Sequence, residues 1–196
     1  MKKLFLIILA LLTFVPLSAQ EQTLISADID HGGFGGMAYQ LTQVNENMAI
    51  MIGGHGGWII NHTFYLGLAG FGMDSEFQLE RDLEDQRYLN LGYGGLEVGL
   101  VVASNRLLHL TASTLLGGGG ATYQQRDRDS DYRENPIVDG FYVIEPALHL
   151  VMNVTRHFRV GLGARYRHVS GVDLEGLTDN DLSGLSGSLI FKFGKF

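Results

Sequence analysis

Cysteine is absent from this 196-residue chain, and only three prolines and one tryptophan occur in it. An exported protein without disulfides must be stabilised in another way. No long segment has the helical period of apolar residues, and the seven histidines are scattered without a His-Glu-x-x-His pattern. These absences argue against a helical fold and a disulfide scaffold, and the sequence predicts no metal site and no cofactor.

Positively charged residues are few, with 14 lysines and arginines against 21 aspartates and glutamates. The formal net charge is −7, and it becomes −9 once Lys2 and Lys3 are removed (−7 − 2 = −9). A balance this acidic argues against a nucleic-acid partner.

The first residues have the pattern of an export signal. Lys2 and Lys3 precede an apolar run from Leu4 to Val15, and small residues follow up to Ala19. The run is too short to span a bilayer of about 30 Å. We therefore predict a cleavable signal peptide over 1–19 and a single domain over 20–196, which is 196 − 19 = 177 residues.

Glycine is abundant, with 27 residues that all follow position 19. The final segment, 182–196, shows the pattern that organises the rest of the chain. Every second residue from Leu185 to Phe193 is apolar or glycine, and the residues between them are mostly polar. This period of two predicts a β-strand with one apolar face.

The same alternation recurs along the chain and predicts eight strands. Their expected ranges are 31–42, 48–60, 63–73, 88–103, 107–124, 140–154, 158–169 and 182–196. In 88–103 the apolar parity changes at Gly94-Gly95, which we interpret as a β-bulge. Pro146 cannot donate to a ladder, so a local bulge is expected there too.

The predicted connections alternate in length. Asn61-His62, Ser104-Asn105 and Thr155-Arg156 are tight turns, whereas the other connections include the long polar segments 74–87, 125–139 and 173–181. Short turns at one end and long loops at the other are typical of a bacterial outer-membrane barrel with both termini in the periplasm. The connection 44–47 departs from this rule because it is short.

Six charged residues within the strands lie on the parity opposite to the large apolar residues. They are Glu97, Glu145, Arg159, Arg165, Arg167 and Lys192. A soluble barrel would have to bury these charges in an apolar core, whereas a membrane barrel turns them into a polar interior. Pairing 140–154 with 158–169 around Thr155 places Glu145 opposite Arg165, and we predict an ion pair. The expected fold is all-β, an eight-stranded antiparallel transmembrane β-barrel, whose side-chain-filled lumen argues against general porin activity.

Two segments carry a family resemblance. The closing segment DLSGLSGSLIFKFGKF, with its terminal Phe196, resembles the last strand of outer-membrane β-barrels, and GGHGGWIINHTF adds a resemblance to the small outer-membrane barrels of Bacteroidota. The resemblance implies insertion in the cell outer membrane, contact with its lipid and lipopolysaccharide, and engagement of the barrel assembly machinery through the terminal aromatic. It implies no catalytic residue.

A third segment resembles a different family. RYRHVSG, residues 165–171, is similar to the end of the lipid A deacylases, in which a His-x-Ser-Asn motif lies on the penultimate strand. The resemblance implies that His168 and Ser170 form a base and nucleophile pair on the outer wall. Gly171 stands where that family has Asn, and an acid to orient the histidine has no clear counterpart.

Three functions remain open from the sequence. The first is a non-enzymatic outer-membrane barrel with a structural or surface-interaction role through acidic external loops, and it assigns no catalytic, metal or cofactor residue. The second is an outer-membrane lipid A esterase that uses His168 and Ser170. The third is a soluble periplasmic ligand-binding barrel.

Overall fold

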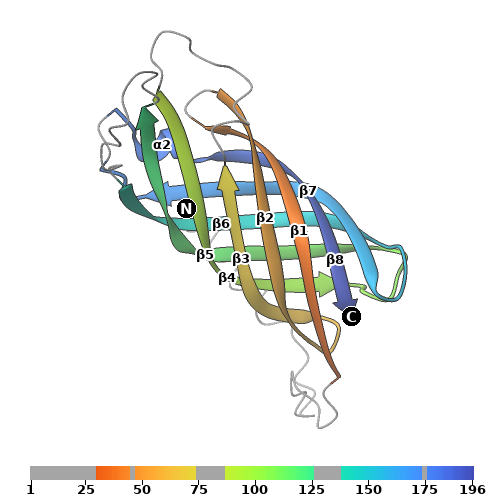
Figure 1. Cartoon of the computed structure of the whole chain (residues 1–196). Coiled ribbons are helices and arrows are strands. Elements are labelled where there is room, and N and C mark those ends of the chain that lie inside the picture. Colours follow the sequence, from red (N-terminus) through yellow and green to blue (C-terminus); the bar gives the residue numbers. More distant parts are fainter. Residues whose placement is uncertain (1–29, 45–46, 74–86, 126–137, 174–175) are drawn as a thin grey trace, which may run out of the picture.

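The computed structural model describes residues 30–44, 47–73, 87–125, 138–173 and 176–196. Eight antiparallel strands form a closed barrel, in which β1 completes the cylinder by pairing with β8 (Figure 1). The elements are β1 (His31–Val44), β2 (Asn47–Ile60), β3 (Phe64–Met73), β4 (Arg87–Val102), β5 (Leu108–Gln125), β6 (Val138–Asn153), β7 (Phe158–Ser170), the short helix α2 (Asp179–Leu182) and β8 (Gly184–Lys195).

The predicted fold class is therefore confirmed, and each strand begins and ends within two residues of its expected bounds. The last strand starts at Gly184 rather than at Leu182, because Leu182 is the final residue of α2. The predicted signal peptide over 1–19 and most of the two long polar loops, 74–86 and 126–137, lie outside the described residues.

The two ends of the barrel differ in their connections (Figure 1). Tight turns join β2 to β3, β4 to β5 and β6 to β7 at one end, which we call the turn end, and β8 also finishes there. Asn61 and His62 have φ angles of 50° and 54° in the first of these turns. Two successive left-handed residues are what a tight hairpin needs to match the twist of its strands. The opposite end, which we call the loop end, carries the connections after β1, β3, β5 and β7.

In each strand, alternate residues point into the barrel and the residues between them point outward, as predicted. Leu148 and Leu162 face outward with 56% and 67% of their surface exposed, whereas Glu145 and Arg165 face inward with 0% and 1% exposed. Among the outward strand residues whose side chains are described, none is Asp, Glu or Arg. The outer wall is thus apolar, and the buried charges lie inside the cylinder.

The predicted β-bulge at Gly94-Gly95 is wrong. The pairing of β4 with both β3 and β5 passes through these glycines without a change of register. Leu89, Leu91 and Tyr93 therefore point inward, where all three are buried. The apolar parity changes along β4 because this part of the interior is itself apolar, not because the strand slips.

The bulge expected at Pro146 is also absent. Pro146 lies opposite Thr114 of β5 in an unbroken register. Toward β7 the ladder is interrupted at Glu145 and Pro146 and then resumes in the same register. The missing N–H is accommodated by a gap in the ladder, without an extra residue.

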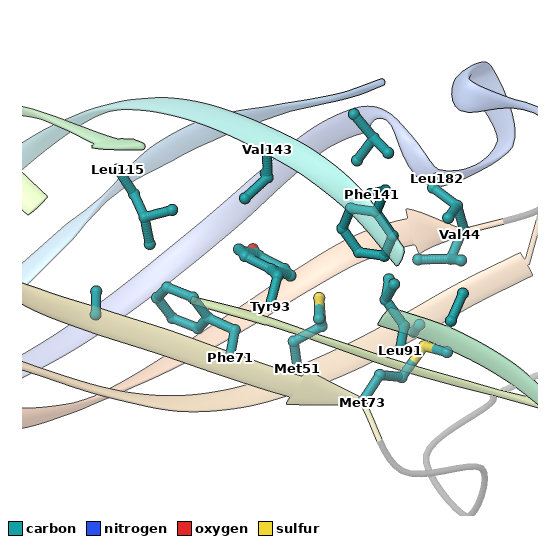
Figure 2. Packing of buried hydrophobic residues seen from close by; sticks show 14 of the residues in the cluster. Val44, Met51, Phe71, Met73, Leu91, Tyr93, Leu115, Phe141, Val143 and Leu182 are labelled. Carbon is teal, nitrogen blue, oxygen red and sulfur yellow. The ribbon is translucent and has the colours of Figure 1, made fainter. Parts of the chain in front are cut away.

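Apolar side chains from facing strands meet inside the loop half of the barrel (Figure 2). Figure 2 shows them pointing toward one another across the interior, with Leu182 of α2 among them. The larger members of this loop-end cluster are Val44, Met51, Phe71, Met73, Leu89, Leu91, Tyr93, Leu115, Phe141, Val143, Val151, Val169, Leu177, Leu182 and Ile190. A smaller turn-end cluster consists of Phe34, Ile59, Tyr65 and Val101, with Phe196 packed against it. Apolar side chains therefore lie toward both ends of the barrel, and members of the larger cluster such as Val151 and Ile190 extend beside the polar residues of its middle.

The connection from β7 to β8 contains α2, which the sequence did not predict. Thr178 forms a capping box with Asp181, in which the backbone N–H and the hydroxyl of Thr178 both donate to the carboxylate at 2.7 Å. Leu177 and Leu182 are 5% and 0% exposed and pack into the loop-end cluster. Among the described residues no helix is long and apolar enough to cross a membrane.

Candidate functional site

An ionic network occupies the middle of the barrel, with Arg165 at its centre. Its Nε donates to Oε2 of Glu145 at 2.9 Å, and its Nη2 lies 3.6 Å from Oε1 of Glu97. The predicted ion pair is confirmed, but its register is corrected, because Ala147 lies opposite Arg165. Glu145 is the diagonal neighbour, and long side chains bridge that distance readily.

Both carboxylates also accept bonds from neutral donors. Tyr93 donates its hydroxyl proton to Oε1 of Glu145 at 2.6 Å, and Ser113 donates to Oε1 of Glu97 at 3.2 Å. Nδ1 of His55 lies 3.4 Å from the other oxygen of Glu97. All three partners are buried. The carboxylates are therefore held in one arrangement by several strands, as a buried charge requires.

Arg167 joins this interior to the helix at the loop end. Its Nε donates to the backbone carbonyl of Leu182 at 2.6 Å, and its Nη1 and Nη2 lie 3.0 Å from Sδ of Met51 and 3.5 Å from Oγ1 of Thr42. Its described hydrogen-bond partners are therefore all neutral. The contact fixes the C-terminal end of α2 over the loop-end cluster.

Two further cations face the interior at the turn end. Lys192 of β8 is 5% exposed and lies directly opposite the half-buried Arg159 of β7. Nζ of Lys192 lies 4.6 Å from the ring centroid of Phe34 and 4.9 Å from that of Tyr65, and the guanidinium of Arg159 lies 3.9 Å from that of Phe196. No described carboxylate comes within 4.0 Å of either cation. Both cations therefore lie against aromatic faces, and Glu97 attracts Lys192 from a distance greater than that of an ion pair.

His168 and Ser170 lie on the outward face of β7 at the loop end, where both are exposed. His168 is opposite Ile144 and Ser170 is opposite Tyr142 on β6. Neither side chain has a hydrogen bond or ion pair to another residue of the described ranges. The structure thus places both residues where the deacylase resemblance implies, on the same wall, but it does not join them to each other or to an acid.

Another His and Ser pair lies inside the barrel and was not predicted. Nε2 of His149 lies 3.2 Å from Oγ of Ser188, and the two residues are 2% and 1% exposed. Because both side chains are enclosed among buried residues of the interior, we interpret this contact as part of the packing of the barrel. Within the described residues no group of three or more His, Asp or Glu side chains is arranged to hold a metal ion.

The partners of the network could not be found from the sequence alone. Tyr93 and Ser113 share the inward parity of the charges, which is the only signal they carry. Gln40 lies 3.4 Å from the hydroxyl of Tyr93, yet the two are 53 residues apart in the chain. Closure of the barrel brings them together.

A closed barrel of eight antiparallel strands with an apolar wall is the architecture of the small outer-membrane β-barrels. Neisserial surface protein A has a similar structure, with 10% sequence identity, a TM-score of 0.60 and an alignment that covers 86% of this chain and 99% of that one. The attachment invasion locus protein Ail of Yersinia pestis is also similar, with 12% identity and a TM-score of 0.48 over 84% of this chain and 97% of that one. No protein-family model and no curated protein sequence matches the chain. The likeness is one of fold.

Proposed function

We propose that the protein is a non-enzymatic barrel of the cell outer membrane, whose role is structural or lies in surface interactions through its external loops. The outer wall is the observation that carries this proposal. Large apolar residues from all eight strands are exposed on it, such as Leu68 at 66% and Leu185 at 66%. Soluble monomers rarely expose apolar patches of more than a few hundred Å². Lipid is the environment that covers such a wall, which argues against a soluble periplasmic barrel.

Aromatic residues near both ends of the wall support membrane insertion. Trp58, Phe64 and Phe193 are exposed near the turn end, and Tyr142 and Tyr166 are exposed near the loop end. Aromatic girdles of this kind mark the two water interfaces of a membrane barrel. The strands contain 10 to 18 residues, and about 9–11 tilted residues suffice to cross a bilayer.

The interior supports a role other than transport. Buried side chains of the loop-end cluster, the ionic network and the turn-end cluster follow one another along the barrel. An eight-stranded barrel is just wide enough for side chains to fill. Function then falls to the loops, of which 74–86 has six acidic residues and a single arginine. We propose that these loops lie outside the cell beside lipopolysaccharide, and that the assembly machinery inserts the exported chain.

Fractionation and electrophoresis test this proposal. The protein should partition with outer membranes, require detergent for extraction, and migrate faster unheated than boiled, because the folded barrel is compact. Recovery in the soluble periplasmic fraction with no heat-dependent shift would contradict it.

A lipid A esterase is the second candidate, and the outward placement of His168 and Ser170 at the loop end is the observation that favours it. Mass spectrometry of lipid A from cells that express the wild type, Ser170→Ala or no protein tests this function. Loss of one acyl chain only in cells with the wild type would establish the esterase. Identical lipid A from all three would exclude it.

A further inference from the structure

The ladder between β6 and β7 is interrupted once along its described length. Ile144 lies opposite His168 and Ala147 lies opposite Arg165, but the two pairs between them are missing. Because the register is the same on both sides, no residue has been inserted or lost. The break is therefore a loss of hydrogen bonding alone, and its cause is Pro146, which has no N–H.

The break leaves one backbone oxygen without its donor. In an antiparallel pair, every second residue of a strand directs both of its backbone polar groups toward the same neighbouring strand. Val154 directs its N–H toward β7 and donates to the carbonyl of Phe158 at 3.1 Å. Pro146 lies an even number of residues away, so its backbone also faces β7, where Tyr166 lies opposite it in the same register. The carbonyl of Tyr166 thus points at a proline nitrogen that cannot donate, and no described side chain donates to it instead.

This oxygen lies in the outer wall. The side chains of Pro146 and Tyr166 both point outward, and Tyr166 is 48% exposed. In and near the hydrocarbon region of a membrane, a backbone carbonyl without a donor is costly, because little water is there to bond with it. A polar group in this state calls for a bound species that completes its hydrogen bond. On this wall the species would come from the surrounding lipid.

Two more polar groups without a described partner follow on the same face of β7. His168 and Ser170 are the next outward residues toward the loop end, and both are exposed. Ser170 lies roughly 13 Å along the strand from Tyr166, at about 3.3 Å per residue. Tyr142, which is 75% exposed, lies opposite Ser170 on β6. The row therefore places an acceptor on the membrane side and two groups that can donate or accept at the loop end.

The position of the acceptor selects the class of lipid. With the loops outside the cell, as proposed above, the row lies at the level where the headgroups of the outer leaflet join their acyl chains. Glycerophospholipids carry ester groups at that level, which accept hydrogen bonds but have no N–H or O–H to donate. Lipopolysaccharide carries amide-linked and hydroxylated acyl chains there, and both groups donate.

We propose that the outward row of Tyr166, His168 and Ser170 binds lipopolysaccharide, whose acyl amide or hydroxyl group donates to the carbonyl of Tyr166. His168 and Ser170 then face its sugar headgroup. The inference rests on the membrane orientation in the proposed function. It requires binding alone, whether or not His168 and Ser170 are catalytic.

The carbonyl resonance of Tyr166 tests the site directly. Carbonyl-¹³C tyrosine with ¹⁵N arginine gives two signals in a spectrum that correlates each amide with the preceding carbonyl, since Tyr-Arg occurs at 132–133 and 166–167, and Tyr132→Phe removes the other one. For the folded full-length barrel in phosphocholine micelles, which contain no donor, added lipid A, the acylated part of lipopolysaccharide, should move the Tyr166 resonance downfield. Pro146→Val supplies the missing N–H, so its resonance should lie downfield without lipid.

Native mass spectrometry measures the affinity. The wild type should retain one lipid A, and Pro146→Val should bind it about 3- to 10-fold more weakly, because the oxygen already has a donor. Weaker binding by a variant that gains a backbone hydrogen bond does not arise from misfolding. Leu150→Val is the matched control, since it changes an outward residue of the same strand where the pairing with Leu162 is intact. It should bind lipid A as the wild type does.

Dimyristoylphosphatidylethanolamine, whose donor lies in its headgroup, is the comparison lipid and should leave the resonance in place. An equal shift with this phospholipid, no shift with either lipid, or equal binding of lipid A by Pro146→Val and the wild type would overturn the proposal. Heat-dependent migration separates this result from a failure of the proposed function. A barrel that shows the heat shift but does not bind lipid A keeps the proposed function and lacks this site.

Discussion

Substitution of Arg165 by Met isolates what the ionic network contributes to stability. The change removes the shared partner of Glu145, at 2.9 Å, and of Glu97, at 3.6 Å, and leaves both carboxylates buried. Removal of one partner of a buried pair costs about 3–5 kcal/mol. Tyr93 and Ser113 still donate to the carboxylates, so we expect a loss of roughly that size and not the sum of two broken pairs.

The assay is urea unfolding in lipid vesicles, followed by the fluorescence of Trp58. This residue is the single tryptophan and is 49% exposed on the outer wall, so its emission reports departure from lipid. Adding Glu145→Gln and Glu97→Gln to Arg165→Met should restore at least half of the lost stability, because neither position then holds a buried carboxylate that has lost its arginine.

Arg167→Met is the matched control, since its described hydrogen-bond partners are neutral. It should cost only about 1.5–3 kcal/mol, and neutralising the glutamates should not rescue it. The reasoning is refuted if Arg165→Met costs less than about 1 kcal/mol, or if the added glutamine substitutions lower stability further.

Three other predictions concern the outer wall, the packing of the interior and the helix α2. Leu148→Arg should destabilise the barrel in vesicles by about 2–4 kcal/mol in urea titrations, whereas Leu148→Met should be nearly neutral. Gly99→Ala places a Cβ against the ring of Tyr65 and should lower the heat-shift temperature in electrophoresis, whereas Gly72→Ala, with open space around its Cβ, should not. Leu182→Ala leaves a cavity beneath α2, which should speed hydrogen exchange in that helix before the barrel unfolds.

The outline of the barrel could be predicted because the alternation of apolar and polar residues within each strand shows which residues face the interior. Tight turns, strand number and the inward position of charges such as Arg165 and Lys192 follow from local sequence. The errors arose where both faces of a strand are apolar. In β4 the inward Leu89 and Leu91 precede the outward Leu96 and Leu100, and period alone cannot distinguish that arrangement from a bulge.

The interior partners were less predictable, because they depend on which strands face each other across a closed cylinder. The ion pair of Glu145 and Arg165 could be predicted because β6 and β7 form a hairpin. The contact of Arg167 with Leu182 was not, because it requires a helix of four residues whose position depends on the loop-end cluster beneath it. A sequence pattern contains no periodic signal for so short an element.

Apolar residues inside the barrel cover its polar middle unequally at the two ends. The loop-end cluster and α2 cover the ionic network on one side, with Leu177 and Leu182 buried over it. On the other side the covering layer is smaller, and the half-buried Arg159 crosses it beside Phe196. The apolar covering of Lys192 and Arg159 at the turn end is therefore thinner than the covering of the ionic network at the loop end.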